Sequence, residues 1–521
     1  MKQAKETKQI EPTQQEAGAL VLPQQKKSVN AILILLVFLP CLVLTLHLDN
    51  DIWFLLNSGR YVLQHGIPTM EPFTMHQDFH FVMQQWLSAT IFWSIYAKFG
   101  AAGILALVFV VFCATVFVLY RLISLLSGGN EIATFITAMI ASSALKPAMI
   151  SRPMIFTMLI LICELYCVEQ FIRTKKPLWL LPLPAFSALL INLHAAMWPI
   201  QFVILLPYCI DAFRFKFLFL EGEGYPKRFF FPALVLMFLA GFCNPYGWSA
   251  MSYVFRSYGF QEIGIVLEMQ PVDINNASGI LVFGLFFLLL AFYLLKKERS
   301  TRLRFALLSL GTAVLTLSSL RSYSLFAACG IFPLAYFLRD VTLPQSRIQS
   351  QKGVLRLRAV LLVLVAVVVG VLVISRVSEF DEAKETSKAA NAVNYLLEQE
   401  NTDDMILYTG YNDGGYVEYR GLKPYIDPRA EVFVKKNNQV KDVMKEYYEL
   451  ESGKLYYKDF LNTYGFTHLL LTRDEMLYVM LPHDADYELV YEDDAFLVYR
   501  LKWQNAAGLI VYPVCQSSAT H

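Results

Sequence analysis

Two acidic residues stand one residue apart, directly after the first long apolar segment of this chain. Asp49 and Asp51 belong to the stretch LHLDNDIWFLLNSGRYVLQHGIPTMEPFTMHQDFHFVMQQW, residues 46–86. Carboxylates at the mouth of a membrane helix are unfavourable and are found there mainly where they have a function. Such a pair could remove a proton from a hydroxyl group or orient it. The simpler alternative is that the two aspartates only cap a helix at the membrane interface.

Four more polar residues stand at the ends of apolar segments farther along the chain: Arg152, His194, Asn244 and Arg321. A guanidinium group matches phosphate oxygens bidentately, so the two arginines are candidate phosphate ligands. His194 could bridge to either kind of group, and Asn244 completes the candidate substrate-binding set. Two alternatives stay open: Arg152 could reach lipid headgroups instead, and His194 could be only a hydrogen-bonded residue at a helix end.

The composition places these residues in a polytopic membrane protein. Apolar residues make up 56% of the 521 and charged residues 17%, which is far from the soluble average. The net charge of +1 and the lack of a basic tract exclude nucleic acid as an expected partner. Residues 1–28 are polar and predict a disordered cytoplasmic tail. No small-residue cleavage site follows, so the first apolar run is expected to stay uncleaved.

Eleven apolar runs approach the length of about 20 residues that a membrane-spanning helix needs. They are about 31–48, 102–120, 132–149, 154–172, 178–194, 197–213, 229–243, 277–295, 304–320, 323–339 and 359–375. The apolar run 86–99 is shorter and ends at Lys98-Phe99-Gly100, so it predicts a helix that lies at the interface or enters the bundle without a full crossing. No predicted span was found to carry a charge at mid-depth, which disfavours a transporter.

The basic residues of the loops predict the orientation of the chain. With the N-terminus inside, the connections on the cytoplasmic side carry most lysines and arginines, as the positive-inside rule requires. These residues are Arg121, Arg173, Lys175, Lys176, Arg214, Lys216, Lys227, Arg228, the run 296–304 and five in 339–358. A complete crossing by 86–99 would invert every later loop. The candidate residues from Asp49 to Arg321 therefore fall together on the outer side, with the C-terminus.

The composition changes at about Arg376 and predicts a small extracytoplasmic α/β domain over residues 376–521. Expected strands are 405–409, 415–420, 466–472, 487–493 and 495–501, and expected helices are 381–400, 437–452 and 455–464. The segment 412–415 reads as a tight turn between strands. The remaining chain divides into the tail 1–28 and a transmembrane domain 29–375, whose first outer loop is 48–100.

Other polar groups carry weaker signals. His65, His76 and His80 lack regular ligand spacing, so no zinc site is predicted. Asp427, Arg429 and Glu431 could pair with one another or bind substrate, and the structural pairing is favoured.

The pattern DNDIWFLLNSGRYVLQHGIPTMEPFT (49–74), followed by QQWLSATIFWSIY (84–96), resembles a bacterial group of GT-C-like proteins. GT-C enzymes are polytopic glycosyltransferases that use polyprenyl-phosphate-linked sugars. Further similarities occur in order along the chain, at SRPMIFTML (151–159), NLHAAMWP (192–199), CNPYGW (243–248), LRSYSLFA (320–327), NDGGYVEYRG (412–421) and YIDPRAEVF (425–433).

The resemblance implies a role for each candidate residue. Asp49 is the first candidate, and Asp51 the second, for the acid that acts as general base or orients the acceptor. Arg152 and Arg321 would stabilise the leaving phosphate. No organic cofactor is implied, and metal dependence varies among GT-C families. The chain departs from the pattern at Gln84-Gln85, where related sequences often have an acid beside the residue matching Trp86.

The resemblance and the predicted topology together imply a GT-C-like membrane glycosyltransferase. It would transfer a sugar from a polyprenyl-phosphate-linked donor to a cell-envelope glycan, lipid or protein, in contact with membrane lipids. Nucleotide sugars are cytoplasmic, whereas the polar residues are expected outside. The alternatives are a non-catalytic GT-C-like scaffold in envelope polysaccharide assembly and a polysaccharide polymerase.

Overall fold

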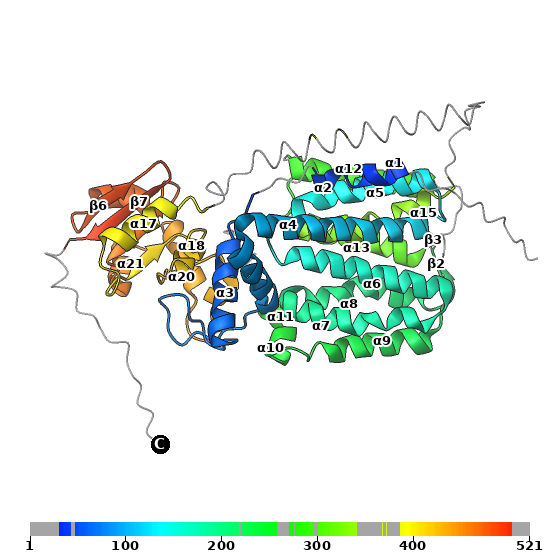
Figure 1. Ribbon diagram of the computed structural model, residues 1–521, viewed down its shortest axis with the longest axis horizontal. Coiled ribbons are helices and arrows are strands. Elements are labelled where there is room, and N and C mark those ends of the chain that lie inside the picture. The colour runs from blue at the N-terminus through cyan, green and yellow to red at the C-terminus, as the bar shows by residue number, and fades with distance from the viewer. Residues whose placement is uncertain are drawn as a thin grey trace, which may run out of the picture.

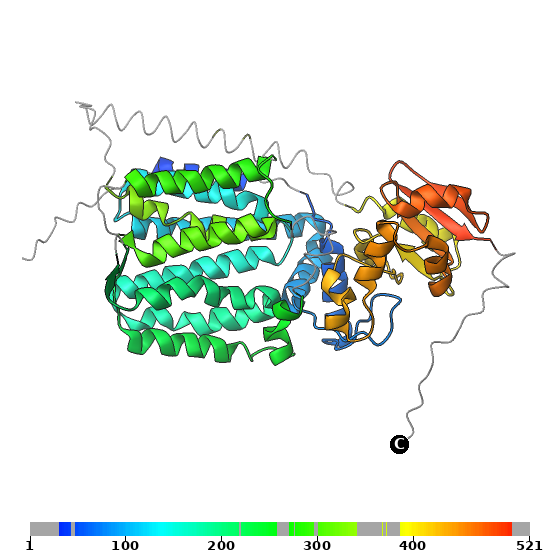
Figure 2. The ribbon, with the colours of Figure 1, turned by 180° about the vertical axis from the view of Figure 1, so that it is seen from behind.

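The computed structural model describes residues 31–42, 47–217, 220–257, 270–275, 277–295, 301–340, 367, 371 and 386–502. Helices before residue 340 form one bundle, and the elements after residue 386 form a second body at one end of it (Figures 1 and 2). Helix α3 (Ile52–His65) lies between the two bodies. The described chain is mostly helical.

The helices of the bundle occupy the predicted apolar ranges up to residue 339. They are α1 (Ala31–Val37), α2 (Leu39–Leu42), α4 (Trp86–Leu126), α5 (Glu131–Leu145), α6 (Met154–Thr174), α7 (Pro182–Leu193), α8 (Trp198–Asp211), α9 (Lys227–Ala240), α12 (Ala277–Leu295) and α13 (Leu303–Ser318). Two described helices, α4 and α6, are long and apolar enough to cross a membrane. The predicted span 359–375 lies outside the described residues, apart from 367 and 371. The number of spans stays a prediction.

Helix α4 changes direction at Gly100, whose backbone angles are φ 60° and ψ −155°. The segment before this kink packs against α3 at the end of the bundle that faces the second body (Figure 1). The segment after the kink runs along the bundle. The separate short helix expected over 86–99 is therefore present as the first part of α4.

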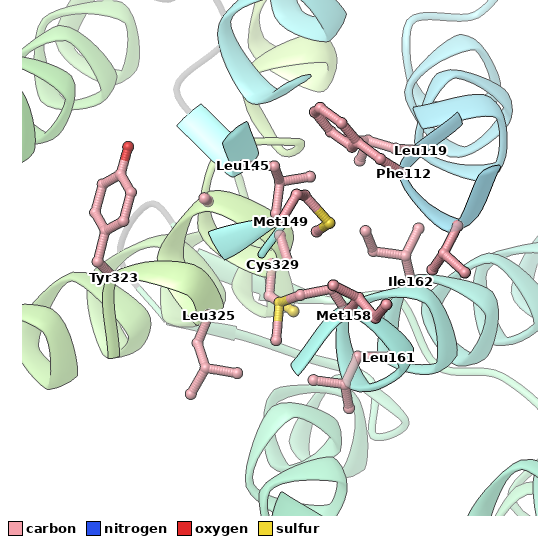
Figure 3. Packing of buried hydrophobic residues seen from close by; sticks show 14 of the residues in the cluster. Phe112, Leu119, Leu145, Met149, Met158, Leu161, Ile162, Tyr323, Leu325 and Cys329 are labelled. Carbon is pink, nitrogen blue, oxygen red and sulfur yellow. The ribbon is translucent and has the colours of Figure 1, made fainter. Parts of the chain in front are cut away.

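The last part of the bundle is irregular. Residues 320–338 form η6 (Leu320–Ser322), α14 (Tyr323–Leu325), the π-helix η7 (Phe326–Gly330) and α15 (Leu334–Leu338). Pro333 precedes α15, and proline lacks the amide hydrogen that a continuous helix needs. Fully buried Cys329 packs there among apolar side chains of α4, α5 and α6 (Figure 3).

One expectation about the bundle is wrong. Glu164 lies at the middle of α6 and is only 1% exposed, so a helix that is long enough to span a membrane does carry a carboxyl group at mid-length. Its Oε1 atom is buried without a hydrogen-bond partner. The apolar residues around Glu164 dominate the hydropathy of this segment, so the sequence pattern does not reveal the carboxyl group. Because a mid-length carboxyl group is present, a transporter is no longer disfavoured on this ground.

The second body contains a four-stranded sheet in the order β4-β5-β7-β6. Strand β4 (Leu407–Thr409) is parallel to β5 (His468–Thr472), and β7 (Phe496–Leu501) is antiparallel to both β5 and β6 (Tyr487–Glu492). These strands fall within four of the five predicted runs. The helices are α17 (Ala390–Gln399), α18 (Gly414–Tyr419), α19 (Lys435–Asn438), α20 (Val443–Glu451), α21 (Tyr457–Tyr464) and α22 (Met476–Met480).

The predicted strand 415–420 is wrong, because this segment forms helix α18. Residues three apart share one face of a helix, and Tyr416 and Tyr419 both contact Trp53 of α3, at ring centroid distances of 5.0 and 5.1 Å. A Cβ atom at Gly414 would lie 1.9 Å from the carbonyl oxygen of Ile426, so only glycine fits there. The turn 412–415 thus joins a strand to a helix and not two strands.

The first outer loop and the second body share one hydrophobic core. Phe73, Phe79, Phe81 and Met83 of the loop pack in the same buried cluster as side chains of the sheet and its helices. The division of the chain at residue 376 stays a prediction, but the loop 48–100 is packed against both bodies.

Candidate active site

Asp49 and Asp51 converge on one guanidinium group. The Nε atom of Arg152 lies 2.7 Å from Oδ1 of Asp49 and 3.2 Å from Oδ2 of Asp51. The side chains are partly exposed, at 28% for Arg152, 17% for Asp49 and 23% for Asp51. The arginine predicted to bind phosphate therefore binds both predicted catalytic carboxylates.

The backbone at the start of α3 fixes this arrangement. The amide of Asp49 donates to Oγ of Ser151 (2.8 Å), and the amide of Asp51 donates to Oδ1 of Asp49 (3.0 Å). Asp51 is the residue that precedes α3, but its side chain makes no capping hydrogen bond. Helix capping alone therefore does not account for Asp51.

His194 and Arg321 lie close together at the same end of the bundle. His194 is 4% exposed, and its Nδ1 is 2.9 Å from Oγ1 of Thr157. The charge of Arg321 acts on His194 and also on Tyr411 of the second body. Arg321 is exposed, and its guanidinium forms no hydrogen bond or ion pair within the part of the chain that the structure describes. It is free to bind an anion.

The charges of Arg321 and of two carboxylates, Glu431 and Asp51, all act on Tyr411. Burial raises the pKa of Tyr411, and the charges of Glu431 and Asp51 raise it further, whereas Arg321 opposes the rise. The phenol is therefore neutral and donates a hydrogen bond of 2.8 Å to the carbonyl of Pro428. The charges of Glu431, Asp51 and Arg321 thus all act on the same hydroxyl group.

Asn244 has a local role. Its amide group donates to the carbonyls of Gly241 (2.6 Å) and Gly247 (3.1 Å), and its side-chain oxygen accepts the amide of Tyr246 (2.7 Å). These bonds hold the turn that leads to α10 (Trp248–Met251). The structure does not bring Asn244 into contact with the other candidates.

Glu431 belongs to the site, although it was not among the predicted catalytic residues. Oε1 of Glu431 accepts a hydrogen bond of 2.7 Å from the side chain of Gln84. Gln84 in turn accepts the amides of Ala195 (2.8 Å) and Ala196 (3.2 Å), which follow His194 directly. The second body therefore places a carboxylate beside Gln84, where the resemblance would put an acid. The signal in the sequence was the segment YIDPRAEVF, in which three charged residues recur at every second position.

Asp427 and Arg429, by contrast, form the structural pair that was favoured. The Arg429 guanidinium contacts the carboxylates of Asp427, Glu418 (2.9 Å) and Glu71 (3.1 Å). The side chain of Arg429 is 4% exposed and the three carboxylates are fully buried. Glu71 comes from the first outer loop, so this cluster joins the loop to the second body.

The histidines of the first loop are used in packing. His76 stacks on Phe79 at 4.8 Å and contacts the carbonyl of Tyr425 at 2.8 Å, and its burial lowers the pKa of the imidazole to about 4. Among the described residues, no group of three or more His, Cys, Asp and Glu side chains could hold a metal ion.

Comparison with known proteins gives the fold. No protein-family model and no curated protein matches the sequence. The structure is similar to the oligosaccharyltransferase of Archaeoglobus fulgidus, solved with a tethered acceptor peptide, at a TM-score of 0.53 and 12% identity over 92% of this chain and 75% of that one. The chain has a GT-C fold.

Two further GT-C enzymes are similar at lower scores. ArnT from Cupriavidus metallidurans, solved with undecaprenyl phosphate bound, has a TM-score of 0.48 and 12% identity over 90% of this chain and 96% of that one. The mycobacterial arabinofuranosyltransferase AftD has a TM-score of 0.48 and 11% identity over 91% of this chain and 41% of that one. The likeness to the oligosaccharyltransferase confirms, at the level of the fold, the resemblance seen in the sequence.

Proposed function

We propose that this GT-C protein is a membrane glycosyltransferase that uses a polyprenyl-phosphate-linked sugar. The observation that carries the proposal is the arrangement of charges. Two carboxylates, Asp49 and Asp51, are held by Arg152, while Arg321 remains free for an anion at the same end of the bundle. A proton acceptor and a separate phosphate ligand are the two groups that transfer from a phosphate-linked sugar needs.

The reaction breaks the bond between the anomeric carbon and the phosphate oxygen and forms a bond from that carbon to the acceptor oxygen. The acceptor hydroxyl loses its proton to a carboxylate, Asp49 or Asp51. The phosphate leaves with the electron pair of the broken bond, and the guanidinium of Arg321 stabilises its negative charge. Arg152 keeps the two carboxylates in place and contributes to phosphate binding only if it releases them.

The acceptor belongs to the cell envelope and reacts on the outer face. The basic segments 173–176, 212–217 and 220–228 lie at the end of the bundle opposite to the second body (Figure 1). Because basic loops stay in the cytoplasm, the end with Asp49 and Arg321 would face outward. A lipid-linked donor is present there, whereas a nucleotide sugar is not.

The proposal is tested by neutralising the two carboxylates. In cells, Asp49→Asn and Asp51→Asn should each abolish the envelope glycan that is lost when the gene is deleted. Asp459→Asn, which changes an exposed carboxylate of α21, is the matched control and should leave the glycan unchanged. If neither active-site change alters any envelope glycan while removal of residues 381–521 does, the protein is a scaffold and not a transferase.

The phosphate ligand is tested separately by binding. Arg321→Gln should weaken the binding of undecaprenyl phosphate to the purified protein about 10- to 100-fold, because a charge-assisted hydrogen bond contributes about 1.5–3 kcal/mol. Lys98→Gln, which removes an exposed cation from the same end of the bundle, should have little effect. Equal losses in both variants would contradict a specific role for Arg321.

A further inference from the structure

A basic cavity lies at the end of the bundle opposite to the candidate active site. It has a volume of about 620 Å³ and is lined by Lys175, Phe213, Arg214, Gly224, Tyr225 and Lys227, with Ala212 and Pro226. The lining contains three cations and no carboxylate. It lies near the small sheet formed by β1 (Phe215–Phe217), β2 (Leu220–Gly222) and β3 (Thr301–Arg302), at the end where Figure 1 labels β2 and β3.

Three separate turns bring the cations together. Lys175 ends α6 in a left-handed conformation, Arg214 follows α8, and Lys227 begins α9. Gly224 has φ 69°, and a Cβ atom there would lie 2.1 Å from Cγ of Arg214. Only glycine therefore lets the stem of Arg214 lie against the backbone at this wall of the cavity.

The acidic residues nearby are already paired with other arginines. Buried Arg304 binds Glu169 (2.9 Å), Asp211 (2.6 Å) and Glu223 (2.8 Å). Arg302 binds Glu221 at 3.1 Å. Arg304 and Arg302 hold these carboxylates away from the lining, although three carboxylates on one guanidinium group leave excess negative charge next to the cavity.

The three lining cations make few ion pairs of their own. Lys175 has only a long contact of 3.8 Å to Glu223, which Arg304 holds more closely. Within the described ranges, Arg214 and Lys227 form no ion pair. The ammonium group of Lys227 lies 3.9 Å from the ring centre of Phe213, a contact that leaves its charge in place.

A phosphate group suits this cavity. Phosphate oxygens accept hydrogen bonds from both guanidinium and ammonium groups, and three cations exceed the charge of one phosphodiester. Phe213 and Phe217 beside the cavity are 49% and 66% exposed, as expected of aromatic side chains at a lipid interface. The cavity is also at the end of an apolar bundle, where lipid headgroups lie.

We propose that this cavity binds the phosphate of an anionic membrane lipid. The site is distinct from the proposed transferase site, which is at the other end of the bundle, and it does not depend on the transferase activity. Lys175, Arg214 and Lys227 bind the phosphate oxygens, and Phe213 contacts the apolar part of the lipid.

The test measures lipid binding to the delipidated full-length protein in detergent by native mass spectrometry. Phosphatidylglycerol should bind, and Arg214→Gln and Lys227→Gln should each weaken this binding about tenfold. Arg228→Gln is the matched control, because Arg228 is the next residue of α9, is equally exposed and does not line the cavity. Its effect should stay below about twofold.

Two further arms identify the source of the phosphate. Zwitterionic phosphatidylcholine should bind more weakly than phosphatidylglycerol, and millimolar inorganic phosphate should not displace phosphatidylglycerol. Displacement by inorganic phosphate would overturn the lipid assignment in favour of a free phosphate. Equal losses in Lys227→Gln and Arg228→Gln, or equal binding of the two lipids, would overturn the site. Unchanged thermal unfolding of the variants excludes a folding defect as the cause.

Discussion

At the scale of residues, the two aspartates share a single arginine. An ion pair with Arg152 has to loosen before either Asp49 or Asp51 can take a proton. Glu431 differs, because the partners of its carboxylate are the neutral amide of Gln84 and the hydroxyl group of Tyr253. No cation holds this carboxylate among the contacts of the described residues, so we expect it to orient the acceptor hydroxyl, whose proton passes to Asp49 or Asp51.

This difference gives a first prediction. Glu431→Gln should lower sugar transfer by about 100-fold, because the acceptor hydroxyl is no longer correctly oriented, while binding of undecaprenyl phosphate stays normal. The control is Gln84→Ala, which removes the amide partner but keeps the carboxylate and should retain most activity. Sugar transfer by both variants is measured as the amount of the envelope glycan that is lost when the gene is deleted. Normal transfer by Glu431→Gln, or equal losses in both variants, would show that Glu431 has only a structural role.

At the scale of elements, the buried Arg429 cluster attaches the first outer loop to the second body. Replacing Arg429 by Met leaves the buried carboxylates of Glu71, Glu418 and Asp427 without their cation. Breaking a buried ion pair from one side costs about 3–5 kcal/mol. We therefore expect Arg429→Met to lower the thermal unfolding midpoint of the purified protein markedly.

The matched control for this prediction is Arg473→Gln. Arg473 pairs with Glu492 at 3.1 Å, but the two side chains are 39% and 48% exposed. An exposed pair contributes at most about 1 kcal/mol. A similar fall in the unfolding midpoint for both variants would mean that the Arg429 cluster does not hold the loop and the second body together.

The turn between β5 and α22 of the second body contains a buried carboxyl group that makes the stability depend on pH. Burial raises the pKa of Glu475 to about 8, although the hydrogen bond from the amide of Thr472 opposes the rise. Because the folded pKa is raised, the stabilising effect of the protonated form is fully present below about pH 4 and is lost as the pH rises through 8.

Glu475→Gln stays neutral at every pH and should remove this dependence. The variant should match the wild type near pH 4 and be more stable at pH 9, by about 5 kcal/mol at most. The measurement is the denaturation midpoint as a function of pH. Glu398→Gln, on the exposed face of α17, should keep the dependence of the wild type. Persistence of the dependence in Glu475→Gln would assign it to another group.

At the scale of the whole molecule, the two ends of the bundle are chemically different. The end near α3 carries the site residues and the second body, and the end near β2 and β3 carries the basic cavity (Figure 1). The positive-inside rule then predicts that the basic end faces the cytoplasm.

Cysteine labelling tests this orientation. In a background where exposed Cys243 and also Cys515 are serine, an impermeant maleimide added to whole cells should label Lys454→Cys in the second body. Lys216→Cys in β1 should react only after lysis. Both positions are exposed. The reverse pattern would contradict an outward-facing active site.

The sequence by itself determined the class of the protein, because apolar runs and their flanking charges are local properties. It predicted the helices of the bundle, the GT-C resemblance and the polar residues at the segment ends. Four of the five predicted runs in the second body contain strands for the same reason.

Only the tertiary structure decided which of these residues meet. Arg152 binds both Asp49 and Asp51 because two segments about a hundred residues apart in the sequence come into contact. The approach of Glu431 to Gln84 spans 347 positions. Helix α18 replaces a predicted strand because Tyr416 and Tyr419 pack on Trp53, a contact that no local pattern contains. The basic cavity likewise depends on how the helices pack. This packing brings the three cations together and places the neighbouring carboxylates against Arg304 and not in the lining.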